Sequence, residues 1–167
     1  MARIIELDKA RIPQAKALVA QVFRHQDLTE RMSFWAYKHQ STPVVKTLLK
    51  LYGYMAVFRY WVALNENDEI CGTTGLYAEK DDFHEALWLS WFCVNPNMRG
   101  QGIGKQLLEF SIDTAREYKK KYLRLYTSDD PNEAAAQFLY EKYGFRIVRT
   151  EKKRGYTLLY RELALKG

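Results

Sequence analysis

Three glycines alternate with other residues in the segment Arg99-Gly100-Gln101-Gly102-Ile103-Gly104-Lys105. The segment stands between an apolar, strand-like run and a stretch of helical periodicity, which predicts a tight turn that opens a helix. A helix begins with unpaired backbone N–H groups and a partial positive charge, and glycines let these groups approach a ligand closely. Arg99 and Lys105 add positive charge. The expected ligand is a phosphate or pyrophosphate.

The spacing of these glycines excludes two common phosphate-binding motifs. Dinucleotide-binding folds need G-x-G-x-x-G and an acidic residue about 20 positions further on, where this chain has Arg124. Nucleoside triphosphate loops need G-x-x-x-x-G-K-[ST], which is also missing. The competing interpretation is an ordinary tight turn whose glycines serve only the backbone angles. Three glycines in five positions between two cations favour the phosphate site.

Metal chemistry and covalent catalysis have little support in the sequence. The histidines share no metal-ligand spacing, and the cysteines are too few for a disulfide framework or a four-ligand zinc site. Ser90 lacks the G-x-S-x-G context of a hydrolase nucleophile. Each cysteine lies in an apolar run, so we expect reduced, buried thiols and a cytoplasmic location. The residues concerned are His25, His39, His84, Cys71 and Cys93.

Length and charge narrow the class of protein. The chain has 167 residues, which predicts a single domain over residues 1–167. Its net charge of +6 indicates anionic partners without choosing among nucleic acid, a membrane surface and a phosphorylated small molecule. The longest apolar run covers residues 86–94, whereas a membrane-spanning helix needs about 20 residues. We therefore expect no membrane association, and no signal peptide is recognisable.

Hydrophobic periodicity predicts an α/β or α+β fold, with helices packed on one mixed, largely antiparallel sheet. Helices are expected to start at Pro13 and Pro43, the second one carrying Tyr52, and residues 29–54 are otherwise hard to interpret. Asp130, Pro131 and Glu133 predict a capping box, and Gly144 the end of that helix. The expected strands are 3–7, 57–64, 70–77, 87–94, 122–127, 145–148 and 156–163, and the expected helices are 13–23, a helix from 43, 102–119 and 131–143.

The motifs of this sequence resemble those of the GNAT superfamily of N-acetyltransferases. Those enzymes carry [RQ]-x-x-G-x-[GA] between their fourth strand and third helix, and Arg99, Gly102 and Gly104 fill its fixed positions. The run Trp-Phe-Cys-Val-Asn-Pro at 91–96 resembles the end of the family's fourth strand. Phe-Leu-Tyr-Glu-Lys-Tyr-Gly-Phe at 138–145 is similar to its Y-x-x-x-G-F helix end. The resemblance extends over residues 60–163.

This resemblance implies a co-substrate and a reaction. Acetyl-CoA would place its pyrophosphate on the backbone of residues 99–105 and its pantetheine beside strand four, with strands four and five splayed apart. A backbone N–H of that strand would polarise the thioester carbonyl, and an acceptor amine would attack it directly. Tyr140 corresponds to the family tyrosine that protonates the departing thiolate. The implied binding residues on strand four are Phe92, Cys93 and Val94.

Two departures from the family pattern concern the helix start and the general base. Where the family often has Asn, this chain has Glu133, and Asn132 lies one place early; Asn132 is retained as a cofactor contact, with helix capping as the alternative. Where many members carry a glutamate base on strand four, this chain has Trp88. Glu79, Glu85 or ordered water is left to accept the amine proton, unless these acids belong to a solvated turn.

Several alternatives stay open. The acceptor is a small amine, such as a polyamine or an aminoglycoside, or a protein amine, and the aromatic, basic segment 31–60 lines its site or belongs to the core. The basic run 116–124 is a solvated helix end or a contact for the ribose phosphate of coenzyme A. A non-catalytic acyl-CoA sensor and, with less support, a nucleic-acid-binding module compete with the enzyme. A homodimer also stays open.

Overall fold

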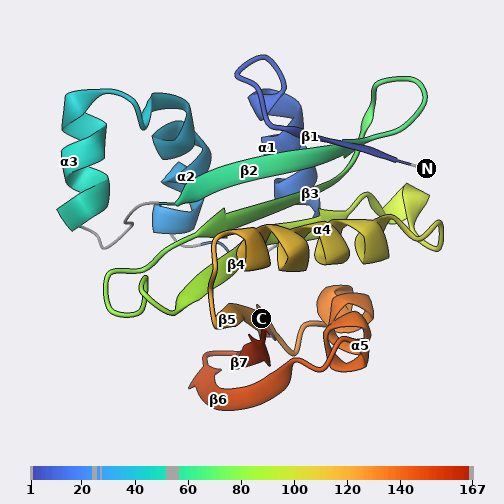
Figure 1. The fold of residues 1–167 in the computed structure, drawn as a ribbon. Coiled ribbons are helices and arrows are strands. Elements are labelled where there is room, and N and C mark those ends of the chain that lie inside the picture. Colours follow the sequence, from blue (N-terminus) through green and yellow to red (C-terminus); the bar gives the residue numbers. More distant parts are fainter. Residues whose placement is uncertain (1, 24–25, 27, 52–56, 166–167) are drawn as a thin grey trace.

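The computed structural model describes residues 2–23, 26, 28–51 and 57–165. These residues form a seven-stranded sheet in the order β1-β2-β3-β4-β5-β7-β6, with helices on both faces (Figure 1). The helices are α1 (Ile12–Val22), α2 (Leu28–His39), α3 (Pro43–Leu51), α4 (Ile103–Glu117) and α5 (Ala134–Lys142), with short 3-10 turns η1 (Pro96–Met98) and η2 (Pro131–Glu133). The strands are β1 (Arg3–Glu6), β2 (Phe58–Leu64), β3 (Ile70–Tyr77), β4 (Ala86–Val94), β5 (Tyr122–Ser128), β6 (Arg146–Lys153) and β7 (Tyr156–Ala164).

Neighbouring strands are antiparallel except for β4 and β5, which are parallel. The parallel pairing is short, since only residues 86–88 of β4 pair with residues 122–124 of β5. Beyond that point the two strands separate, and in Figure 1 the sheet divides into a β1–β4 part and a β5–β7 part. The mixed, largely antiparallel sheet with splayed fourth and fifth strands is thus confirmed.

Alternating residues of the central strands belong to two different hydrophobic cores. In β2, Trp61 and Ala63 pack with α4 and α5, whereas Tyr60, Val62 and Leu64 pack with α1 and α2. Successive side chains of a strand point to opposite faces, so the two cores lie on opposite sides of the sheet. The predicted helix at residues 102–119 is confirmed as α4, and its apolar side, including Leu107 and Leu108, is fully buried.

Two elements differ from the expectation. The helix α2 was not predicted, because Leu28, Met32 and Trp35 repeat at helical spacing on its exposed side while Phe34 and Tyr37 face the core, so no single apolar stripe marks it. Strand β6 continues to Lys153 instead of ending at 148, because it is an edge strand of almost entirely exposed residues. The α3 helix begins at Pro43 as predicted; Tyr52, which was expected on it, lies outside the described residues.

Candidate active site

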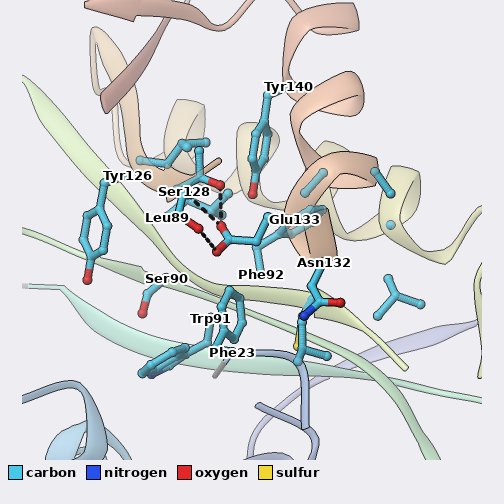
Figure 2. Close-up of a pocket in the computed structure, with 18 of the residues that line it drawn as sticks. Phe23, Leu89, Ser90, Trp91, Phe92, Tyr126, Ser128, Asn132, Glu133 and Tyr140 are labelled. Carbon is cyan, nitrogen blue, oxygen red and sulfur yellow. Dashed lines mark hydrogen bonds between the residues drawn. The ribbon is translucent and has the colours of Figure 1, made fainter. Parts of the chain in front are cut away.

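The separation of β4 from β5 opens a cleft of about 1000 Å³ (Figure 2). Its walls come from the end of β4, the turn before α4, β5, η2 and α5, and from aromatic side chains on the α1–α2 side. Nearly all the site residues expected from the sequence meet here: Phe92, Cys93, Val94, Arg99, Gly100, Gly102, Ile103, Gly104, Lys105, Asn132 and Tyr140. Gln101 belongs to the same turn but is exposed and does not line the cleft.

β4 contains a β-bulge, which bends the strand beside the cleft. The register between β3 and β4 shifts at Thr73 to Gly75, where β4 carries one extra residue. Trp91 adopts a φ of 45°, a left-handed conformation that is rare for a bulky side chain. Its indole Nε1 donates a hydrogen bond of 2.8 Å to Ser33 on α2, and its ring packs against Phe23. The bend is therefore held in place from the α1–α2 side.

The glycine turn presents free backbone donors to the cleft. Gly100 and Gly102 have φ values of 78° and 77°, and a Cβ built on either would meet nothing within 4 Å. Gly102 is the N-cap of α4 and supplies no side-chain cap. Among the described residues, none accepts a hydrogen bond from the backbone N–H of Ile103, Gly104 or Lys105. The turn and the helix dipole therefore favour an anion at this end of the cleft.

Tyr140 lies on α5 with its side chain directed into the cleft (Figure 2). Only 4% of it is exposed, and its ring packs between Phe92 and Phe145 with both centroids 5.6 Å away. Burial, with the charge of Glu133 nearby, raises the pKa of the Tyr140 phenol well above its ordinary value near 10. Its hydroxyl forms no hydrogen bond with another described residue. It is thus a protonated donor aimed at the cleft.

Of the capping box predicted at the start of α5, the Asp130 cap is confirmed and the role given to Glu133 is wrong. Asp130 does accept a hydrogen bond from the backbone N–H of Asn132, but residues 131–133 form the 3-10 turn η2. The Glu133 carboxylate turns back to the end of β5, where it accepts hydrogen bonds from Thr127 and Ser128 (Figure 2). These buried hydroxyls give the carboxylate stronger partners than one backbone N–H at the helix start. Gly144 ends α5 as predicted, since Phe145 N–H bonds to the Tyr140 carbonyl in a Schellman motif.

The acidic turn between β3 and β4 is not simply solvated. Arg124 forms ion pairs with Asp82, Glu85 and Glu162 at 2.6–2.9 Å, and the Asp82 side chain is only 14% exposed. Asp82 also accepts a hydrogen bond from Trp88, the residue at the position of the family's strand-four glutamate. Glu85 is thus committed to Arg124. The basic run 116–124 likewise belongs to the surface and this ion-pair cluster, and it does not line the cleft.

Glu79 has a connection to the cleft. The hydroxyl of Tyr77, a cleft-lining residue, donates to the Glu79 carboxylate at 3.5 Å. Burial raises the pKa of Glu79, and the neighbouring Asp82 adds to the shift. Of the two acids considered as a base, Glu79 is therefore the one linked to the cleft.

Residues that the sequence did not indicate complete the wall opposite the glycine turn. Glu30 of α2 accepts a hydrogen bond of 2.8 Å from the Tyr126 hydroxyl of β5. Further tyrosines from β2, β3 and β7 line the same part of the cleft. Only the high tyrosine content of the chain hinted at them, because residues 96 positions apart in sequence meet at this wall.

The described residues contain no group of three or more His, Cys, Asp or Glu side chains that could hold a metal ion. His25 lies outside the described residues. Cys71 and Cys93 are both buried free thiols, as expected, and burial raises the pKa of Cys93 to about 12. Within the ranges that the structure describes, no helix is long and apolar enough to cross a membrane.

A family model described as an acetyltransferase (GNAT) domain matches residues 56–147, more than half of the chain. The chain belongs to the GNAT family of acetyltransferases. The glycine turn, the splayed strands and Tyr140 therefore lie in a GNAT domain, and the expectation of an acetyl-CoA-dependent N-acetyltransferase is confirmed at the level of the family. The match also includes the whole of β4, α4, β5 and α5.

Two of three curated relatives carry an acceptor in their names, and the two acceptors differ. Over 114 residues the chain is 30% identical to the probable N-acetyltransferase 14 of Xenopus tropicalis, covering 67% of this chain but only 53% of that protein. It is 27% identical to the peptidyl-lysine N-acetyltransferase YjaB of Escherichia coli K12, covering 87% and 84% of the two chains. It is 32% identical to the spermine/spermidine N(1)-acetyltransferase of Bacillus subtilis 168, covering 53% and 59%.

Solved structures share the fold of this GNAT chain at low sequence identity. A GNAT-family acetyltransferase from Staphylococcus aureus Mu50 has a TM-score of 0.75 at 21% identity, covering 99% of this chain and 100% of that one. The putative acetyltransferase yncA of Salmonella typhimurium, solved with acetyl-CoA, has a TM-score of 0.69 at 21% identity, covering 99% and 94%. At this identity, the likeness establishes the architecture of the sheet and helices.

Proposed function

We propose that this chain acts as one domain that transfers the acetyl group of acetyl-CoA to a primary amine, with Tyr140 as the proton donor to the leaving sulfur. The observation that carries the proposal is the meeting of three features in one cleft: unpaired backbone donors at a helix start, an unpaired strand edge and a buried tyrosine. A cytoplasmic location fits the two free, buried cysteines.

The glycine turn fits the diphosphate of coenzyme A. The open space beside Gly100 and Gly102 leaves room for phosphate oxygens where other residues would place a side chain. The N–H groups of residues 103–105 point out of the first turn of α4, and Arg99 and Lys105 flank them. Asn132, across the cleft on η2, is a further candidate contact.

The free edge of β4 fits the pantetheine arm. Residues 92–94 lie beyond the stretch of β4 that pairs with β5, so backbone groups on that side can bond to an extended amide chain. When bound, acetyl-CoA supplies an acetyl thioester. A backbone N–H of this strand edge would stabilise the negative charge that develops on the carbonyl oxygen, as an oxyanion hole does.

Tyr140 performs the proton transfer. Its raised pKa keeps the hydroxyl protonated near neutral pH, and the packing of its ring against Phe92 directs it at the strand edge. A phenol in this position can protonate the departing thiolate. On the acceptor side, Tyr77 and Glu79 provide a route along which the amine proton can leave. The attacking amine needs no covalent enzyme intermediate, so holding both reactants aligned supplies much of the acceleration.

A thiol-release assay with acetyl-CoA and a panel of amines tests the proposal. We expect release that depends on a primary amine and is lost when only a tertiary amine is offered. Binding of coenzyme A without release with any amine would instead support the acyl-CoA sensor. Binding to DNA or RNA that falls steeply with salt, without coenzyme A affinity, would support the nucleic-acid module.

A further inference from the structure

The half of the cleft away from the glycine turn brings α2 and β5 together. Tyr126 of β5 donates its hydroxyl proton to Glu30 of α2 at 2.8 Å, which joins two elements 96 residues apart in sequence. Tyr126 is 39% exposed, and its ring centroid lies 6.1 Å from that of Tyr160. Figure 2 shows Tyr126 standing apart from Tyr140 in the pocket. The Glu30–Tyr126 pair therefore lies at a distance from the proton donor.

Glu30 differs from the other acidic side chains of the cleft. Among the described residues that line it, the acids are Glu30, Asp130 and Glu133. Asp130 accepts the N–H of Asn132, and Glu133 is surrounded by the donors at the end of β5. Both lie on the α5 side. Glu30 supplies the negative charge on the α2 side.

The same region contains rings suited to a cation. Of the tyrosines that line the cleft there, Tyr126 and Tyr160 are the more exposed, whereas Tyr60 and Tyr77 are buried. The faces of aromatic rings attract cations, and the Arg149 guanidinium already lies 3.7 Å from the Tyr160 ring centroid. Besides Arg99 and Lys105 at the glycine turn, the described cations that line the cleft are Lys153, which is ion-paired with Glu151, and Arg31, which is exposed on α2.

A carboxylate does not favour the attacking amine itself. An opposite charge nearby stabilises the protonated form of an amine, whereas attack on a thioester needs the neutral form. A carboxylate that keeps the attacking nitrogen in a lasting ion pair therefore opposes attack, unlike Glu79, which is proposed to lie on the route along which that nitrogen loses its proton. The same carboxylate strengthens binding when it pairs with an ammonium group that stays protonated.

We propose that Glu30 and Tyr126 bind a second, non-reacting ammonium group of the acceptor, so that the preferred substrates are alkyl diamines and polyamines. This rests on the proposed acetyl transfer and names its substrate class. The Glu30 carboxylate pairs with the second ammonium, the Tyr126 hydroxyl holds the carboxylate, and the tyrosine rings contact the alkyl chain between the two nitrogens. Isolated primary amines and single lysine side chains lack the second charge.

The test compares 1,5-diaminopentane with pentylamine, which has the same chain but a single nitrogen. In the wild-type protein we expect kcat/KM for the diamine to exceed that for the monoamine roughly tenfold, well above the twofold advantage of having two reactive ends. In Glu30→Gln this ratio should fall to about two, with kcat/KM for pentylamine and the Kd of coenzyme A unchanged. Tyr126→Phe should lower the ratio part of the way.

Glu66→Gln serves as the matched control, because Glu66 is exposed in the turn between β2 and β3, away from the cleft. It should leave the ratio at its wild-type value. A wild-type ratio near two, or a high ratio that survives in Glu30→Gln, would overturn this proposal while leaving acetyl transfer intact. Failure of every amine to release thiol, with coenzyme A bound, would overturn the proposed function and this proposal with it.

Discussion

Replacing Tyr140 with Phe removes one oxygen atom and should separate catalysis from binding. If the hydroxyl protonates the leaving sulfur, kcat should fall by about 10²–10⁴-fold. This corresponds to about 3–5 kcal/mol of transition-state stabilisation. The ring keeps its packing between Phe92 and Phe145, and the hydroxyl has no hydrogen-bond partner among the described residues. The free energy of unfolding should therefore change by less than about 1 kcal/mol.

Tyr143→Phe is the matched control, because Tyr143 lies one helical turn further along the chain and does not line the cleft. Its hydroxyl donates a hydrogen bond to Glu109 of α4. Losing that bond should lower the free energy of unfolding by about 1 kcal/mol and leave kcat unchanged. The two variants therefore predict opposite patterns: Tyr140→Phe loses turnover and keeps stability, whereas Tyr143→Phe keeps turnover and loses stability.

Thiol release measures kcat, titration calorimetry with coenzyme A measures Kd, and thermal unfolding measures stability. The pH profile adds a check on the sign. Burial raises the pKa of Tyr140 above its ordinary value near 10, so the donor stays protonated. Deprotonation of Tyr140 should therefore not lower the wild-type kcat up to pH 10. The reasoning is refuted if Tyr140→Phe keeps kcat within threefold of wild type, or if coenzyme A affinity falls as much as kcat does.

Three further changes test the rest of the site and its support. Gly102→Ala places a side chain at a φ of 77° and in the open space of the turn, so coenzyme A should bind at least tenfold more weakly in calorimetry. Gly155→Ala is its control, because Gly155 has a φ of 94°. Each variant should lower the free energy of unfolding by about 1 kcal/mol, but Gly155→Ala should leave coenzyme A affinity unchanged. Arg124→Met leaves three carboxylates without their partner and should lower the free energy of unfolding in urea by about 3 kcal/mol. Burial raises the pKa of Glu79, so the stability that this group contributes is present below its unfolded pKa and is lost as pH rises through its folded pKa. Glu79→Gln should therefore raise Tm at pH 8, where the wild-type carboxylate is charged, but not at pH 4.

The sequence predicted the residues of the glycine turn and Tyr140, which are proposed to serve the acetyl donor, because their signals are local. The residues of the glycine turn are neighbours in the chain, and Tyr140 is four residues from the glycine that ends its helix. Each is recognisable from spacing within one element and its cap. The strand pattern likewise predicted most of the sheet, since buried strands carry continuous apolar runs.

The pair of Glu30 and Tyr126, proposed to bind the acceptor, was not predicted because its members come from distant segments. Glu30 and Tyr126 meet only through the fold, and α2, which carries Glu30, exposes more large apolar side chains than it buries. The capping-box prediction failed for a related reason: Glu133 had a plausible local partner, but the hydroxyls of Thr127 and Ser128 come within reach only when β5 and η2 pack together. Sequence patterns such as a capping box identify partners that are close in the chain, but they do not identify partners that the tertiary fold brings close.

The bulge in β4 links the two halves of the cleft. Its left-handed Trp91 is a conformation that costs about 1–3 kcal/mol, and it persists because the surrounding contacts hold it. Those contacts come from α1 and α2: Phe23 and Phe34 pack on the indole ring, and Ser33 accepts its N–H. Ser33 lies on the same helix as Glu30, so the helix that carries the acceptor-side carboxylate also holds the bend in the strand proposed to bind the acetyl donor. The two proposed substrate sites are thus linked by one packing arrangement around Trp91.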